Sequence, residues 1–254
     1  MTISTTVLLQ WRPERLARWL MLTLMAAVMS GCASGPGATA RDPFEPFNRN
    51  VSQFNESVDA AVLKPVATAY KQATPPLVRT GISNFFGNLS DVWSFVNSAL
   101  QFKFRNAAEN FMRVNVNTFF GLGGILDIAS ELNIDRHRED FGQTLGRWGV
   151  PTGPYIVLPL LGPSTLRDTL ALTLDRQGDP ASHVDPSASR NALYVLPAVD
   201  ARSNLLRAGA VLDEAALDKY TFTRDIYLQR RRAEIFDGNE PDAGEQPEPA
   251  SVGK

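Results

Sequence analysis

The sequence contains a single cysteine, and this scarcity excludes one class of fold. A small exported domain stapled by internal disulfides needs cysteines in pairs, so this chain is not one. Only two histidines are present, His137 and His183, and neither lies in a catalytic or metal-binding motif. No His-Glu-x-x-His sequence occurs, so nothing indicates a zinc site. We therefore expect neither a metal nor a cofactor.

The chain also has little net charge and no long uninterrupted apolar run. Its 25 basic and 27 acidic residues are dispersed and give a formal charge of -2. A nucleic-acid-binding protein concentrates basic residues on one face, so nucleic acid is excluded as a partner. No apolar run after residue 32 reaches the roughly 18 residues of a membrane-spanning helix.

What the sequence does have is an export signal at its N-terminus. Arg12, Arg15 and Arg18 precede an apolar run over 19–29, which ends in Ser30-Gly31-Cys32. The run is too short to span a bilayer, and small residues stand directly before the cysteine. This pattern resembles bacterial lipoprotein signals, which implies cleavage after residue 31 and lipidation of Cys32. The alternative for Cys32 is a free buried thiol.

The residues after Cys32 predict the membrane to which the protein is sorted and a flexible tether between the lipid anchor and the folded domain. By resemblance to the lipoprotein sorting rule, Ala33 in place of an aspartate directs the protein to the outer membrane. Residues 32–40 are rich in small residues and suit a flexible tether. A single folded domain is expected over 41–236, because about 195 residues suffice for one domain. The acidic, proline-containing stretch 237–254 is expected to be a disordered tail.

Apolar periodicity predicts a mainly helical fold. Phe47, Val51, Phe54 and Val58 recur at intervals of four, three and four residues, which is one face of a helix. Ser90 stands where an N-cap is wanted. Proline and glycine then set the boundaries. The predicted helices are 45–60, 66–70 after an interruption at Pro65, 77–86, 90–100, 106–120, 141–148, 165–174, 201–216 and 217–236, with a polar linker over 175–191 and a short apolar piece over 193–196.

Two apolar segments do not fit an ordinary surface. Residues 111–126 carry a wide apolar stripe that suits either a core or a lipid contact. Residues 112–117 alternate like a strand, but their Ala/Glu-rich flank favours a helix. Residues 149–164 are apolar yet broken by four prolines and three glycines, so neither a regular helix nor a central strand is expected there. Contiguous apolar surface of this kind marks a partner, ligand or membrane site, and core packing is the equal alternative.

Motifs that carry chemistry are weak. Gly162-Pro-Ser164 superficially resembles a nucleophile elbow but lacks its second glycine. The glycines at 121–124 lack the last glycine of a dinucleotide-binding fingerprint. Arg167 and Asp168 are better explained by an ion pair or a helix cap than by catalysis. We therefore expect a protein that is not an enzyme.

The chain resembles the MlaA family, also called VacJ, the outer-membrane lipoproteins of the maintenance-of-lipid-asymmetry system. Matching residues run in the family's order through most of the predicted body. They are Asp42-Pro-Phe-Glu-Pro-Phe-Asn-Arg49, Phe54-Asn55, Lys64-Pro65, Tyr70, Arg79, Gly81 to Leu89, Val96-Asn97, Leu100-Gln101, Arg113, Asn117, Gly121 to Gly124, Asp127 to Ala129, Phe141 to Gly149, Gly153 to Tyr155, Leu158-Pro159 and Gly162 to Asp168, with a looser match at Tyr220, Tyr227 and Arg230.

The resemblance implies a single helical ring-like domain lying in the inner leaflet of the outer membrane, with an amphipathic channel at its centre. Such a protein would remove misplaced phospholipids from the outer leaflet and pass them to a soluble periplasmic carrier. Trimeric porins would be its membrane partners. Within it, we expect residues 149–164 to form the channel wall. The candidate lipid-channel residues are Gly149, Gly153, Tyr155, Ile156, Leu158 and Leu160.

Two other functions fit parts of the same sequence. A structural lipoprotein could dock on a porin without moving lipid. A lipid hydrolase could use Ser164 as its nucleophile. Outer-leaflet phospholipid content separates the first alternative from transport, and the release of fatty acid or lysolipid from vesicles identifies the second.

Overall fold

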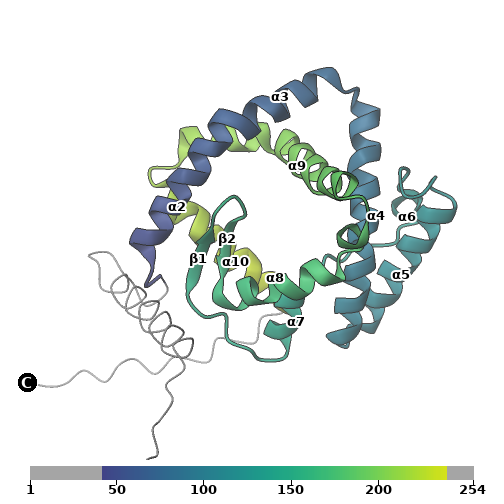
Figure 1. Ribbon diagram of the computed structural model, residues 1–254. Coiled ribbons are helices and arrows are strands. Elements are labelled where there is room, and N and C mark those ends of the chain that lie inside the picture. Colours follow the sequence, from purple (N-terminus) through teal and green to yellow (C-terminus); the bar gives the residue numbers. More distant parts are fainter. Residues whose placement is uncertain (1–41, 239–254) are drawn as a thin grey trace, which may run out of the picture.

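The computed structural model describes residues 42–238, most of which are helical. The predicted export signal, the tether and all but the first two residues of the predicted acidic tail lie outside these residues. In chain order the elements are α2 (Glu45–Val58), a π-helical turn (Asp59–Leu63), α3 (Lys64–Ala73), α4 (Pro76–Leu100), α5 (Phe104–Phe119), α6 (Ile128–Glu131), α7 (Phe141–Arg147), β1 (Tyr155–Leu158), β2 (Gly162–Thr165), α8 (Leu166–Gly178), a 3-10 turn (Pro180–His183), α9 (Ser187–Ala215) and α10 (Lys219–Phe236). Figure 1 shows the helices arranged as a ring, which confirms the predicted fold class.

The predicted interruption at Pro65 is wrong, because α2 and α3 form one continuous arc of the ring. Proline lacks the N–H that an α-helical hydrogen bond needs. The chain accommodates it by widening one turn, over Asp59–Leu63, into a π-helix. The Lys64 N–H bonds to the Asp59 carbonyl five residues earlier, and the helix then resumes with Pro65 in its first turn.

Helix α4 corrects a second prediction, since its 25 residues run through the point where two helices were expected. Ser90 is not an N-cap. Its hydroxyl donates to the Phe86 carbonyl at 3.0 Å, one turn earlier in the same helix. A serine bonded in this way is compatible with a helix interior, so its presence did not mark a boundary.

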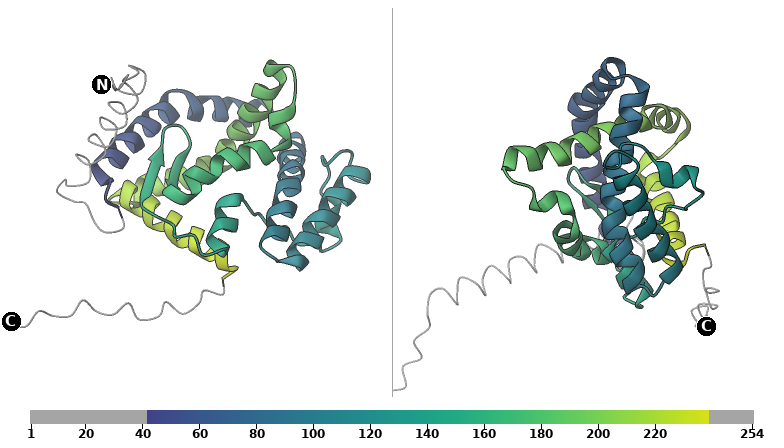
Figure 2. Two further views of the ribbon diagram at one scale, coloured as in Figure 1. Left: turned by 60° about the horizontal axis from the view of Figure 1, so that its bottom comes forward. Right: turned by 90° about the vertical axis from the view of Figure 1, so that its right-hand side faces the viewer.

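Helices α4 and α5 lie side by side at one edge of the ring (Figure 2), and their packed faces are polar. The buried residues of this pair are Gly81, Asn88, Asp91, Ser94, Asn97 and Ser98 on α4 and Ala107, Asn110, Arg113 and Asn117 on α5. The apolar side chains of the predicted stripe point outward instead, and Phe119 is 76% exposed. Residues 112–117 are helical, as their Ala/Glu-rich flank predicted. The stripe therefore faces the surroundings of the protein and is not its core.

Helix α9 also differs from the prediction. The expected polar linker ends early, because α8 continues to Gly178 and α9 already begins at Ser187. Pro197 lies inside α9, where a boundary was expected. Contacts with α3 hold the helix along the ring (Figure 1). Arg202 also forms a bidentate ion pair with Asp59 of the π-helical turn, with both N–O distances at 2.7 Å. Tertiary contacts of this kind override the local preference of a proline.

Residues 149–164 contain a short antiparallel hairpin. Strand β1 pairs with β2 from Tyr155 opposite Thr165 to Leu158 opposite Gly162. Neither a helix nor a central strand is present, as expected, because Pro163 lies in a two-stranded sheet that has only edge strands. Gly162 enters β2 with a φ of +83°, a conformation that favours glycine.

Two asparagines on α2 occupy the free edge of the hairpin. The Asn48 amide donates to the Tyr155 carbonyl at 3.0 Å and accepts from the Val157 N–H at 2.8 Å. The Asn55 amide likewise donates to the Leu158 carbonyl at 2.9 Å and accepts from the Leu160 N–H at 2.7 Å. Each side chain thus supplies one donor and one acceptor, as a neighbouring strand would.

The buried apolar core is small and lies where the hairpin meets α10. Tyr155, Val157 and Tyr220 form its centre, and partly buried side chains of α2 and α10 pack around them. The Tyr220 hydroxyl donates to buried Asp42, and the Arg49 guanidinium lies 4.4 Å from the centre of the Tyr220 ring. These contacts join the start of α2 to the start of α10 and so close the ring. Over residues 42–238, no helix combines the length and the apolar character needed to cross a bilayer.

Candidate functional site

A cavity with a volume of about 900 Å³ is lined by parts of the ring that are far apart in sequence. Its walls come from α4, the stretch before α7, the hairpin and helices α7 to α10. The lining residues are Ser83, Phe86, Gly87, Leu89, Ser90, Trp93 and Ser94; Arg138, Glu139, Asp140 and Gln143; Leu158, Leu161, Pro163 and Ser164; Asp168, Leu172, Asp175, Asp179 and Pro180; Pro197, Asp200, Ala201, Asn204 and Leu205; and Tyr227, Arg230, Arg231 and Glu234.

The lining is amphipathic. Leucine, phenylalanine and proline side chains come from α4, the hairpin, α8 and α9, and charged groups lie between them. The charged groups are seven carboxylates and three guanidinium groups. A site built in this way can contact an apolar chain and a polar group of the same ligand.

Arg231 of α10 is the central cation of the wall. It makes two N–O contacts with Asp140, at 2.6 and 2.7 Å, and a third with Asp168 at 2.9 Å. Burial opposes ionisation of Asp168, but the hydrogen bonds and positive charges of Arg231 and Arg167 together outweigh burial and hold the pKa of this carboxyl below its usual value. Gly142 lies so close that an added Cβ would stand 2.5 Å from the Asp168 carboxylate. The pair therefore needs glycine at this position.

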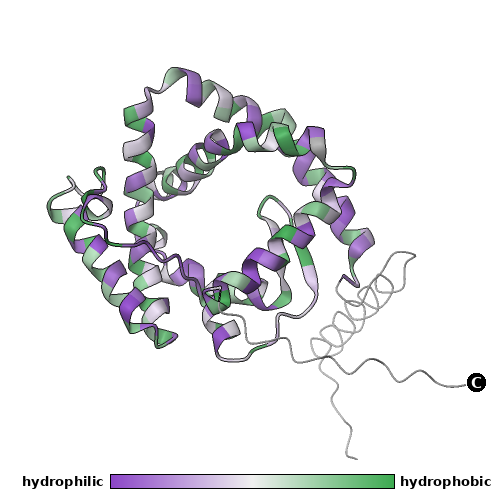
Figure 3. Cartoon of the chain, turned by 180° about the vertical axis from the view of Figure 1, so that it is seen from behind, coloured by the Kyte–Doolittle hydropathy of each residue, from purple (hydrophilic) through white to green (hydrophobic). Residues whose placement is uncertain are grey.

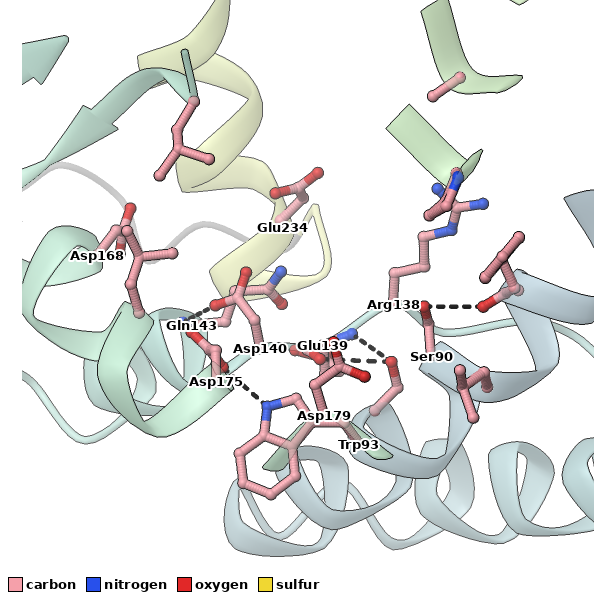
Figure 4. Close-up of a pocket in the computed structure, with 18 of the residues that line it drawn as sticks. Ser90, Trp93, Arg138, Glu139, Asp140, Gln143, Asp168, Asp175, Asp179 and Glu234 are labelled. Carbon is pink, nitrogen blue, oxygen red and sulfur yellow. Dashed lines mark hydrogen bonds between the residues drawn. The ribbon is translucent and has the colours of Figure 1, made fainter. Parts of the chain in front are cut away.

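Asp175 of α8 is a carboxylate that forms no ion pair among residues 42–238. It accepts hydrogen bonds from the indole N–H of Trp93 at 2.8 Å and from the Phe141 N–H at 2.7 Å. Figure 4 shows it close to Asp140 and Gln143. Burial raises the pKa of Asp175, because these two neutral donors offset only part of the desolvation of its charge.

Two further carboxylates are held by polar groups of other elements. Asp200 on α9 accepts from the Tyr70 hydroxyl at 2.9 Å and from the Ser83 hydroxyl at 2.5 Å. Burial, together with this carboxylate, raises the pKa of Tyr70 to about 12. Glu139 pairs with Lys103 at 2.8 Å, and burial raises the pKa of Glu139. The cavity wall is therefore also fixed by α3, α4 and Lys103, which precedes α5.

The six residues predicted to line a channel are not brought together at the cavity. Leu158 lines it, and its neighbour Leu161 does too. Tyr155 does not, because it is buried against Tyr220 and Tyr227 with ring centres 6.2 and 6.1 Å apart. Ile156, Leu160, Gly149 and Gly153 are also absent from the lining. Successive side chains of a β-strand point to opposite faces, so Tyr155 and Val157 of β1 both point into the core. Because no strand was predicted here, the sequence analysis could not separate these residues from those that face the cavity.

The residues considered for catalysis are dispersed. Ser164 lines the cavity, and its hydroxyl contacts Thr169 and the Thr165 carbonyl. His137 lies against Glu109 on α5 and is not part of the cavity lining, and His183 contacts Ser182. Arg167 and Asp168 form the expected ion pair, at 2.9 Å. No group of three or more metal-ligating side chains is present among residues 42–238.

Sequence reasoning missed most of the charged lining. Asp168 and Asp175 are seven residues apart, which places them on one face of a helix two turns from each other. Tyr227, Arg230, Arg231 and Glu234 repeat at helical intervals as well. These helical spacings were the signal in the sequence from which the charged lining could have been predicted.

Comparison with known proteins gives one family. A family model described as MlaA lipoprotein matches residues 40–234. The chain is 35% identical to the intermembrane phospholipid transport system lipoprotein MlaA of Escherichia coli K12, over 91% of this chain and 93% of that protein. It is 34% identical to the Haemophilus influenzae protein of the same name, over 86% and 90% of the two chains.

A solved structure reported as the structural basis for maintenance of bacterial outer membrane lipid asymmetry is similar with a TM-score of 0.64. The identity is 34%, and the match covers 76% of this chain and 98% of that one. The resemblance drawn from the sequence is thereby confirmed, and the chain belongs to the MlaA lipoprotein family.

Proposed function

We propose that this protein is an outer-membrane lipoprotein that removes misplaced phospholipids from the outer leaflet and passes them to a soluble periplasmic carrier. The observation that carries this proposal is the amphipathic cavity inside a ring that exposes many large apolar side chains. Its relatives are named as lipoproteins of a phospholipid transport system, which supports the same function. No covalent chemistry is required of the protein.

The cavity lining suits the passage of a phospholipid. Moving a charged headgroup through hydrocarbon is costly, because the charge loses its hydration. Carboxylate and guanidinium groups along the wall, such as Asp140 and Arg231, offer polar contacts to that headgroup. Leu158, Leu161 and Leu172 offer apolar contacts to the acyl chains on the same path.

The exterior of the ring suits partial burial in a membrane. Large apolar side chains are exposed on nearly every helix. Figure 3 shows apolar residues interspersed with polar ones around the ring. The α4–α5 pair has polar residues inside and phenylalanines outside, the reverse of a water-soluble helix pair. A ring that lies within one leaflet would cover these side chains without any spanning helix.

Anchoring and partners belong to the proposal as well. Lipidation at Cys32 and a tether over 32–40 would place the domain at the periplasmic side of the outer membrane. Trimeric porins and the periplasmic carrier are the proposed protein partners. The hairpin residues Ile156, Leu158 and Leu160 remain candidates for contact with lipid during transfer, with Gly149 and Gly153 flanking them.

The test is the phospholipid content of the outer leaflet in cells with and without the protein. A matched pair of variants on α8 makes it specific to the cavity. Leu172 lines the cavity and is 40% exposed, whereas Leu174 does not line it and is 43% exposed. We expect Leu172→Glu to raise outer-leaflet phospholipid about as much as deletion does, and Leu174→Glu to leave it near the wild-type level.

The same experiment distinguishes the alternative of a structural lipoprotein that docks on a porin. Such a protein would leave the outer-leaflet phospholipid unchanged when it is deleted. An unchanged leaflet in the deletion strain would therefore overturn the transport proposal.

A further inference from the structure

The charges that line the cavity are unbalanced once the internal ion pairs are set aside. Glu139 pairs with Lys103, Asp140 pairs with Arg231, and Asp168 pairs with both Arg231 and Arg167. Glu234 pairs with Arg230 at 2.6 Å. These groups neutralise one another and leave little net charge to present to a ligand.

Three lining carboxylates and one guanidinium group have no ion pair among residues 42–238. The carboxylates are Asp175, Asp179 and Asp200, which accept hydrogen bonds from neutral donors only. The cation is Arg138, which precedes α7 and forms no ion pair in the described chain. In Figure 4, Asp175 and Asp179 lie near Trp93, while Arg138 stands apart from them beside Ser90.

This arrangement differs from a simple anion site. A phosphodiester carries one negative charge, which a single guanidinium group can bind. Three carboxylates without cations would repel a lipid whose headgroup adds no positive charge. They would attract an ammonium group, and the gain is largest at a desolvated carboxylate such as Asp175, whose pKa burial has raised.

We propose that the cavity selects phospholipids with zwitterionic headgroups, Arg138 contacting the phosphate and the carboxylates of Asp175, Asp179 and Asp200 contacting the ammonium group. The preferred cargo is then an amine-bearing lipid such as phosphatidylethanolamine, and phosphatidylglycerol is disfavoured. This inference rests on the proposed transport of phospholipid through the same cavity.

The assay is native mass spectrometry of the full protein in nonionic detergent micelles that contain equal amounts of phosphatidylethanolamine and phosphatidylglycerol. We expect the bound lipid to favour phosphatidylethanolamine about fivefold, the size of effect of a few partly exposed charge contacts. Equal binding of both lipids would overturn the selectivity but leave transport intact. Binding of neither lipid would count against the proposed function itself.

Two variants separate the two contacts. Asp179→Asn keeps the acceptor that bonds the Ala181 N–H at 2.9 Å and removes only the charge. It should lower the preference about twofold, whereas Asp185→Asn, at an exposed position outside the lining, should not change it. Arg138→Gln should weaken binding of both lipids about equally, because both carry the phosphate. Its matched control is Arg147→Gln, an exposed arginine of α7 outside the lining.

A soluble headgroup distinguishes a lipid from a free phosphate compound as the ligand. Phosphoethanolamine added at the lipid concentration should not displace bound lipid, because it lacks the acyl chains that contact Leu161 and Leu172. Displacement at that concentration would overturn the assignment to lipid. An unchanged lipid ratio in Asp179→Asn would overturn the role of the carboxylates.

Discussion

Single charged residues hold this ring together where apolar packing is sparse. Arg231 shows how: its side chain is 10% exposed and joins α10 to Asp140 before α7 and to Asp168 on α8. Removing one partner of a buried ion pair leaves an uncompensated charge, which costs more than the pair itself contributes. The stability of the cavity wall therefore depends on this guanidinium group.

We expect Arg231→Met to lower the free energy of unfolding by about 3 kcal/mol, because Asp140 loses its cation and Asp168 keeps only Arg167. Thermal unfolding in mild detergent, followed by circular dichroism, measures this as a fall of about 10 °C in the midpoint. Arg230→Met is the control. Arg230 is 73% exposed and pairs only with Glu234, so its loss should change the free energy of unfolding by less than about 1 kcal/mol.

Asp127, in the turn before α6, predicts how stability depends on pH. Burial alone would raise its pKa, but hydrogen bonds from Ser130, Asn117 and Arg113 outweigh burial and lower the pKa to about 2. A carboxyl with a lowered pKa stabilises the fold above its unfolded pKa of 3.8, and this contribution is lost as the pH falls towards 2.

The variant Asp127→Asn should therefore lower the free energy of unfolding by about 2 kcal/mol at pH 7 and by much less at pH 2.5. Thermal unfolding at the two pH values measures the difference. Asp135→Asn, at an exposed position, should give the same small change at both. If Asp127→Asn lowered the free energy of unfolding by the same amount at pH 7 and at pH 2.5, the stabilisation would not come from the lowered pKa of Asp127.

At the scale of elements, the position of the hairpin depends on side chains of α2. Asn55 contributes a donor to the Leu158 carbonyl and an acceptor to the Leu160 N–H. Asn55→Leu keeps the volume but removes both hydrogen bonds, at a cost of about 1 to 3 kcal/mol for the groups left without partners. The end of β1 should then detach from α2 more often.

Hydrogen exchange measured by mass spectrometry on peptides that cover 155–162 reports this detachment. We expect faster exchange of the Leu160 amide in Asn55→Leu. Asn115→Leu is the matched control, because the Asn115 amide donates only to the Phe111 carbonyl of its own helix. If the Leu160 amide exchanged equally fast in the two variants, Asn55 would not be what holds the hairpin against α2.

Element boundaries show what the sequence could and could not predict. Helical periodicity correctly placed α2, α5 and α10, whose patterns are long or flanked by clear stop signals. It failed at Pro65, Ser90 and Pro197, because a widened turn, a back-bonded hydroxyl and long-range contacts are invisible to local preference. The hairpin was missed because its hydrogen-bond partners, Asn48 and Asn55, lie about a hundred residues away.

The cavity was predictable only in part for a related reason. The sequence indicated that 149–164 contributes, and Leu158 and Leu161 do line the cavity. Most lining residues come from helices that read locally as ordinary amphipathic segments. Their convergence follows from closure of the ring by α10, which depends on contacts such as those of Tyr220 with Asp42 and Tyr155. No local pattern encodes such closure.

At the scale of the whole molecule, the ring has an unusual distribution of polarity. Arg113 is 1% exposed at the α4–α5 contact, while Phe119 and Phe120 are 76% and 74% exposed at the end of α5. Water would disfavour this arrangement, because exposed phenylalanines lose the free energy that burial provides. A lipid surface removes the conflict, so the ring itself, and not only the lipidation proposed at Cys32, should hold the protein at the membrane.

The resulting prediction concerns Cys32→Ala, exported with the signal peptide of a soluble protein. Without its anchor the protein should still sediment mainly with membranes, because each phenylalanine buried in lipid contributes roughly 1.5 to 3 kcal/mol. Adding Phe119→Glu and Phe120→Glu removes part of that contribution and should shift the partition towards the periplasm by about tenfold or more. In the lipidated protein the same two substitutions should have little effect, because several acyl chains suffice for stable anchoring. A Cys32→Ala protein found entirely in the soluble periplasmic fraction would show that lipidation, and not the exterior of the ring, retains the molecule at the membrane.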